Sequence, residues 1–170
     1  IISDGGSFIL DDALFTVCPW WDGPKARDAI GQQLAADHAR RRDRWVWVYH
    51  APPQNSPVSW SGSRSFGDSA LLEWITAYQP DMVFSGHVHQ SPFVREGSWV
   101  DRIGKTWVFN AGHQFGAPPA HVAIVIPADL PRAEVKAFSI DDVTTTEIDD
   151  AFSVTKLANG NTQVGIHIAV

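Results

Sequence analysis

The segment between residues 44 and 89 constrains the fold most, because two apolar runs in it flank a helical pattern. The runs Arg44–His50 and Met82–Phe84 have consecutive rather than alternating apolar residues, which is typical of strands that are covered on both faces. Between them, apolar residues recur at helical spacing from residue 68 to about 78. We therefore predict a strand–helix–strand unit, whose strands lie parallel and, if they are neighbours, about 5 Å apart.

Each predicted strand of this unit ends in histidine. His50 precedes two prolines that prevent the first strand from continuing, and Gly86 is followed by His87 and His89. Ligands bind at the carboxyl ends of strands in open α/β sheets, and residues i and i+2 of an extended segment point the same way. We therefore expect His87 and His89 to face one pocket beside His50. Neutral imidazole suits zinc and iron, although each histidine alone also fits a surface or hydrogen-bonded core position.

Further elements are predicted on both sides of this unit. A polar pair between apolar runs indicates a β-hairpin over residues 7–17, and an apolar stripe indicates a helix from Lys25 to about Arg42. A second hairpin is expected over residues 98–109, where Gly-Lys supplies the turn. Two more apolar runs predict strands at residues 122–126 and 134–140.

The bulk composition indicates one globular domain. The 170 residues are 44% hydrophobic and 19% charged, which suits a chain with its own core. We assign residues 1–150 to this domain and residues 151–170 to a C-terminal tail, in which Asn159-Gly160 favours a β-hairpin.

Charge and cysteine content limit the binding partners and the cellular compartment that we expect. The net charge of -6 gives no electrostatic reason to bind nucleic acid or an anionic membrane. No apolar run approaches the roughly 20 residues that span a bilayer, and no signal-peptide pattern opens the chain. The single cysteine, Cys18, leaves no intrachain disulfide framework, which is compatible with a cytoplasmic location.

A joint pattern carries more information than any single histidine. An apolar strand ending in His-Ala-Pro-Pro, a helix, an apolar strand ending in Gly-His-x-His and a hairpin ending in Asn-Ala-Gly follow one another. Together they resemble the calcineurin-like metallophosphoesterase family over residues 7 to about 148, whereas H-x-H alone also occurs in amidohydrolase-type and cupin-type sites. The resemblance implies an α/β fold, a four-layer α/β/β/α sandwich with mixed sheets.

The resemblance also implies a metal centre and a reaction. His50 and His87 match ligands of one metal ion, and His89 matches a ligand of a second. The family's two divalent ions, typically Mn, Fe or Zn, share a hydroxide that attacks a phosphoester, which is two-metal chemistry. The substrate implied is a small-molecule phosphomonoester or phosphodiester.

The chain departs from the family in its acidic motifs. D-x-H, G-D-x-x-D and G-N-H-D/E are absent, and Gly67-Asp68 lacks the second Asp. Because these motifs come first in the family, we expect this chain to be the C-terminal half of such an enzyme. The piece alone is then expected to hold one metal or none, and a homodimer is one way to cover apolar faces uncovered by the missing half. The alternative function is a non-catalytic, degenerate or truncated half-domain that is stabilised by oligomerisation and binds at most one metal.

Several other polar and aromatic residues fall near the predicted strand ends. Asn110, His113 and Trp60 are candidate substrate-binding residues, although an ordinary loop histidine explains His113 equally well. Other loop aromatics are expected to rim the site, whereas tryptophans inside predicted strands are expected to pack in the core. The rim candidates are Trp20, Trp21, Phe66 and Trp99, and the core candidates are Trp45, Trp47 and Trp107.

Overall fold

The computed structural model describes residues 4–10, 12–20, 23–40, 43–114, 120–126, 138–139 and 150–168. Its first half contains β1 (Ser7–Leu10), β2 (Ala13–Val17), α1 (Pro24–His38), β3 (Arg44–Val48), η1 (Pro57–Ser59), α2 (Ser69–Tyr78) and β4 (Met82–Ser85). Its second half contains η2 (Ser91–Phe93), β5 (Val100–Ile103), β6 (Thr106–Asn110), β7 (His121–Ile126), β8 (Phe138–Ser139), β9 (Asp150–Lys156) and β10 (Thr162–Ile168).

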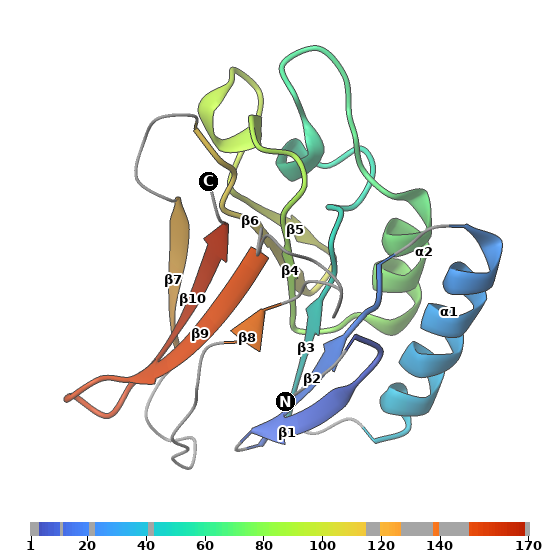
Figure 1. The fold of residues 1–170 in the computed structure, drawn as a ribbon, viewed down its shortest axis with the longest axis vertical. Coiled ribbons are helices and arrows are strands. Elements are labelled where there is room, and N and C mark those ends of the chain that lie inside the picture. The colour runs from blue at the N-terminus through green and yellow to red at the C-terminus, as the bar shows by residue number, and fades with distance from the viewer. Residues whose placement is uncertain are drawn as a thin grey trace.

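These elements form three layers (Figure 1). The six-stranded sheet has the order β1-β2-β3-β4-β6-β5, and the four-stranded sheet has the order β7-β10-β9-β8. Helices α1 and α2 cover one face of the six-stranded sheet, and the four-stranded sheet lies against its other face. The chain therefore has the mixed α/β fold that was predicted. Among the described residues, no helix forms the fourth layer of the sandwich.

The predicted strand–helix–strand unit is confirmed. β3 and β4 are parallel neighbours that align Val46 with Met82 and Val48 with Phe84, and α2 connects them. The helix begins where predicted, because the Asp68 carboxylate accepts a hydrogen bond from Ala70 N at 2.7 Å. β2 and β6 extend the parallel set on either side, so four parallel strands occupy the middle of the sheet. Antiparallel β1 and β5 form its edges, as the two predicted hairpins require.

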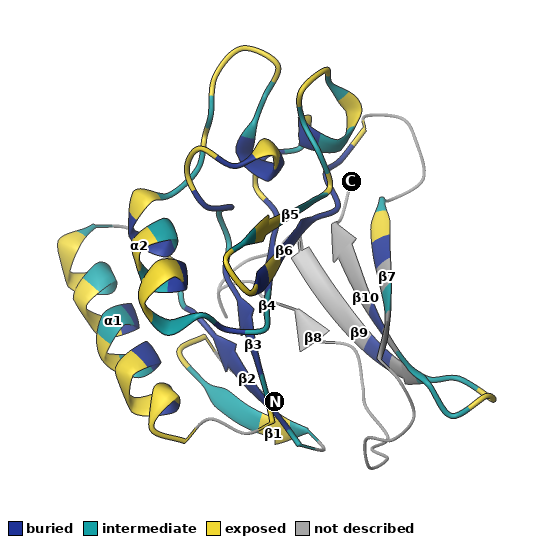
Figure 2. Cartoon of the chain, turned by 180° about the vertical axis from the view of Figure 1, so that it is seen from behind, coloured by how far each residue is buried: buried dark blue, intermediate teal, exposed yellow. Residues whose placement is uncertain are grey.

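Side chains of the central strands alternate between two cores. In β3, Trp45 and Trp47 pack with the helices, whereas Val46 and Val48 pack toward the four-stranded sheet. Figure 2 shows these strands as the most buried elements, while the outer faces of α1 and α2 are exposed. The core prediction is wrong for Trp107, which is 44% exposed and lies under the Arg102 guanidinium.

Other boundaries differ from the sequence prediction. Helix α1 ends at His38, four residues before the predicted end, and no side chain caps its start at Gly23. β9 and β10 form an antiparallel hairpin in the tail, and β10 pairs with β7, so these strands share one sheet. Of the strand predicted at 134–140, only Phe138–Ser139 is described, and the rest lies outside the described residues. No helix in the described part of the chain is long and apolar enough to cross a membrane.

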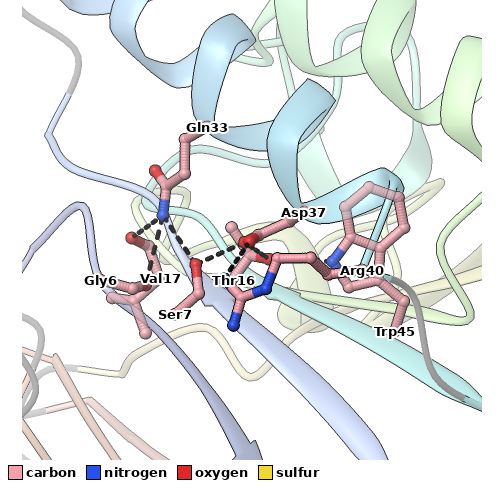
Figure 3. Close-up of polar contacts among 8 residues, drawn as sticks. All are labelled: Gly6, Ser7, Thr16, Val17, Gln33, Asp37, Arg40 and Trp45. Carbon is pink, nitrogen blue, oxygen red and sulfur yellow. Dashed lines mark hydrogen bonds and ion pairs between the residues drawn. The ribbon is translucent and has the colours of Figure 1, made fainter.

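A buried polar network joins α1 to the sheet (Figure 3). Asp37, only 2% exposed, accepts hydrogen bonds from the hydroxyls of Ser7 and Thr16 and pairs with Arg40 at 3.2 Å. Thr16 Oγ1 in turn accepts the indole N–H of Trp45 at 2.9 Å. The network thus connects α1 to β1, β2 and β3, and it satisfies a carboxylate that would otherwise be costly to bury.

Candidate metal and ligand site

The parallel strands bring four segments of the chain to one edge of the six-stranded sheet. Trp20 follows β2, His50 follows β3, His87 follows β4, and Asn110 ends β6. The β3–β4 pairing continues past the strands, since Gly86 N–H donates to the His50 carbonyl oxygen at 2.9 Å. This is the carboxyl edge, where ligands bind in open α/β sheets.

His50 and His87 are in direct contact at this edge. His50 Nε2 lies 3.0 Å from His87 Nδ1, and which atom donates depends on the tautomers of the two rings. The Trp20 ring meets the edge of the His50 ring, with centroids 4.0 Å apart. Burial lowers the pKa of His50 to about 4, and the neighbouring His87 and His89 act in the same direction. His50 is therefore neutral at pH 7, which is the form that binds metal ions.

The backbone at His87 differs from the predicted extended segment. His87 has φ 61°, and Val88 N–H donates to the Gly86 carbonyl oxygen at 2.7 Å, which closes a three-residue turn. A γ-turn with positive φ at its centre is rare and strained, and such strain clusters at functional sites. The sharp turn lies at His87 rather than at Gly86, so this segment is not the extended run that the sequence predicted.

The His89 ring packs against the ring of His113. Their ring centroids lie 5.1 Å apart with the rings steeply inclined to each other, and His113 N–H donates to the His89 carbonyl oxygen at 2.9 Å. Gly112 makes this approach possible: it has φ 66°, and a Cβ there would lie 2.5 Å from Pro92 and 2.6 Å from the His89 carbonyl oxygen. The edge of the sheet therefore holds two imidazole pairs, one made by His50 and His87 and the other by His89 and His113.

Asn110 orders the loop that carries these histidines. It is fully buried, and its amide nitrogen donates to the carbonyl oxygens of Val58 and Val88 at 2.9 Å and to Ser91 Oγ at 3.0 Å. Its amide oxygen accepts from Gly112 N–H at 2.9 Å. The predicted substrate contact Asn110 thus uses its amide within the protein, where it holds three loops together.

A pocket of ≈390 Å³ lies beside the His50–His87 pair. Of the aromatic residues predicted to rim the site, Trp20 and Phe66 line this pocket, whereas Trp60 and Trp99 do not, and Trp21 lies outside the described residues. Its lining is mostly apolar with a few polar groups, as in small-molecule sites. It comprises Pro19, Trp20, Tyr49, His50, Ala51, Phe66, Gly67, Asp68, Ser69 and His87.

From the sequence, we did not identify three polar residues that line this pocket, Tyr49, Asp68 and Ser69. The Tyr49 hydroxyl donates to Asp68 Oδ2, and burial raises the pKa of Tyr49, so the hydroxyl stays protonated. Their positions in the sequence could have identified Tyr49 and Asp68. Tyr49 directly precedes His50 at a strand end, and Asp68 caps the helix that leads to the next strand.

The donor set fits part of a metal site. Two nitrogens that each lie about 2.0–2.1 Å from a tetrahedral zinc ion are about 3.3 Å apart, close to the His50–His87 distance. Within the part of the chain that the structure describes, no group of three His, Cys, Asp or Glu side chains is placed to hold an ion. The pair therefore offers two ligand positions.

Comparison with known proteins yields similarity at the level of the fold. No protein-family model and no curated protein matches the chain. One solved crystal structure aligns over 66% of this chain and 46% of its own, with 16% identity and a TM-score of 0.54. The TT1561 protein of Thermus thermophilus aligns over 65% of this chain and 48% of its own, with 13% identity and a TM-score of 0.48. A single mutant of Vps29 from Entamoeba histolytica aligns over 91% of this chain and 82% of its own, with 12% identity and a TM-score of 0.26.

The chain spans about half the length of the first two of these structures. At such low identity the likeness shows the fold alone. That fold is consistent with part of a metallophosphoesterase-like sandwich.

Proposed function

We propose that this chain supplies part of the active site of a metal-dependent phosphoesterase. The observation that carries the proposal is the 3.0 Å approach of His50 Nε2 to His87 Nδ1, at the carboxyl edge of four parallel strands. Two features support it. His50 is neutral at pH 7, and a pocket of small-ligand size adjoins the pair.

The proposed ligand assignment uses three of these four histidines. His50 and His87 hold one divalent ion of the whole enzyme, and His89 contributes to a second. Bound Mn, Fe or Zn ions would supply Lewis-acid stabilisation of charge on the phosphate oxygens. The chain's own residues fix the ligands: Asn110 anchors Val88 between the two histidines, and His113 packs against the His89 ring. Trp60 and His113 remain candidate contacts to a phosphomonoester or phosphodiester.

Metal content and hydrolysis of bis(p-nitrophenyl) phosphate test this assignment. Both would be measured for this chain and for a longer polypeptide that includes it, with His50→Ala and His87→Ala compared against His121→Ala. His121 is an exposed histidine on the four-stranded sheet, so it controls for loss of an imidazole. We expect the first two variants to lose bound metal and at least about tenfold of the activity, the loss typical of weakened metal ligation. Unchanged metal content and turnover in both would overturn the proposal.

A non-catalytic half-domain is the second candidate function. The mutual hydrogen bond between His50 and His87 favours it, because each ring then has a partner without any metal. Among the residues that the structure describes, six large apolar side chains are exposed, including Ile9, Trp99 and Trp107, and association with another copy would cover some of them. Two metal equivalents with turnover support the enzyme. One equivalent or none, without turnover and in a dimer seen by light scattering, supports the half-domain.

A further inference from the structure

The pocket beside His50 has an aromatic side that metal chemistry does not use. Trp20 and Phe66 both line it, yet they are 53% and 42% exposed. Isolated exposed aromatics are ordinary, but two that border one pocket form a surface on which a flat ring can stack. The Arg64 guanidinium lies 4.1 Å from the Phe66 ring centroid, and this cation–π contact helps to fix the ring at the pocket wall.

The pocket also has a fixed hydrogen-bond acceptor. Asp68 Oδ2 accepts the Tyr49 hydroxyl, and Asp68 Oδ1 accepts Ala70 N–H at 2.7 Å. These contacts hold the carboxylate in one orientation. Each carboxylate oxygen can accept two hydrogen bonds, so Asp68 can still accept one from a ligand. A ligand that meets this group needs an N–H or O–H donor.

The charges of the residues that line the pocket indicate that it suits the uncharged part of a ligand better than a phosphate. None of the ten lining residues is Lys or Arg, whereas one is Asp. A phosphate beside Asp68 would meet a like charge, and no Lys or Arg among the lining residues would offset it. The aromatic side therefore suits the uncharged part of a ligand, and a phosphate fits better at the His50–His87 pair.

We propose that this pocket binds a planar nitrogen heterocycle bearing an amino group, as in an adenine-type nucleobase. The ring stacks on Trp20 and Phe66, and the amino group donates to Asp68. The volume of ≈390 Å³ lies within the range of small-ligand pockets, about 300–1,000 Å³. Placing the phosphate of a nucleotide at the His50–His87 pair rests on the proposed function, whereas binding of the base does not.

Ligand-observed NMR and calorimetry on the whole chain test the base site with adenosine, which carries no phosphate. Purine riboside, which lacks the amino group, and ribose are the comparison ligands. We expect adenosine to bind more tightly than purine riboside, and ribose not to bind. Trp20→Leu and Phe66→Leu should each weaken adenosine binding about tenfold, the loss expected from removing one stacking partner. Trp99→Leu, which removes a similarly exposed aromatic outside the pocket, should leave binding unchanged.

The Asp68→Asn variant tests the proposed hydrogen bond from the amino group of the ligand to Asp68. Asn can still cap the helix, so the fold should persist, and circular dichroism checks this. We expect this variant to lose the preference for adenosine over purine riboside while it retains stacking. Equal binding of adenosine and ribose, or equal effects of Trp20→Leu and Trp99→Leu, would overturn the proposal. Phosphoesterase turnover without adenosine binding would refute only the base site, and adenosine binding in a protein without metal or turnover would refute only the proposed function.

Discussion

The Asp37 network and the strand-end pocket both place polar side chains against the same sheet, but they satisfy those side chains in different ways. Asp37 is 2% exposed and is held by Ser7, Thr16 and Arg40. His50, His87 and Asp68 instead line a pocket that a ligand can enter. A closed network stabilises the fold, whereas an open one keeps hydrogen-bonding capacity for a ligand. Polarity alone therefore does not identify a functional site; access does.

Disrupting the closed network should cause the largest loss of stability. Asp37→Ala leaves the buried Thr16 hydroxyl and the Ser7 hydroxyl without their acceptor, so we expect a loss of about 3 kcal/mol in the free energy of unfolding. Urea denaturation measures this, and Asp28→Ala, which removes an exposed carboxylate of the same helix, is the matched control at under about 0.5 kcal/mol. A similar stability for the two variants would show that the network is not the main attachment of α1.

A substitution at Asn110 tests whether its buried hydrogen bonds support the loop that carries the proposed metal ligands. Asn110→Ala removes the amide that joins Val58, Val88 and Ser91, and we expect a loss of about 2 kcal/mol. Because Val88 lies between His87 and His89, metal binding should weaken more than adenosine binding in the protein that stays folded. Gln54→Ala, an exposed amide on the long loop, is the control. A variant with full metal affinity would show that Asn110 serves stability alone.

The sequence predicted the strands and helices around the Asp37 network and the strand-end pocket better than it predicted the side-chain contacts within them. Apolar runs and helical spacing identified β3, α2 and β4, because parallel strands covered on both faces leave a continuous apolar signal. The histidine-ended strands identified His50 and His87 as neighbours, since parallel strands end at one edge.

Residues whose roles depend on tertiary packing were not predictable in this way. The positive φ of His87 has no signature in Gly-His-Val-His, where glycine is the residue expected to turn. Asn110 follows an apolar run and could face either way, and only the fold shows that three loops converge on its amide. Trp107 lies on a strand, yet its position beside edge strand β5 leaves it exposed.

The stability of the protein should also depend on pH, through His50. Burial lowers the pKa of His50 to about 4, below its ordinary value of 6.5, so the unfolded chain binds this proton more readily than the folded one. Stability should therefore fall as the pH drops from about 6.5 to 4, and His50→Gln should reduce that slope. Urea denaturation across this range measures it, and NMR should place the His50 titration near pH 4. A His50 midpoint near 6.5 would contradict the burial of the ring.

The smallest effect should come from the ion pair between the two helices. Arg27 Nη2 lies 2.6 Å from Glu73 Oε2, a shorter contact than that between Arg40 and Asp37, but its side chains are 43% and 64% exposed. Water screens exposed charges and holding two long side chains costs entropy, so a double-mutant cycle with Arg27→Ala and Glu73→Ala should give a coupling of about 0.5 kcal/mol or less. Added salt should reduce it further. A coupling as large as the loss from Asp37→Ala would mean that contact distance, rather than burial, determines how strongly polar groups stabilise this fold.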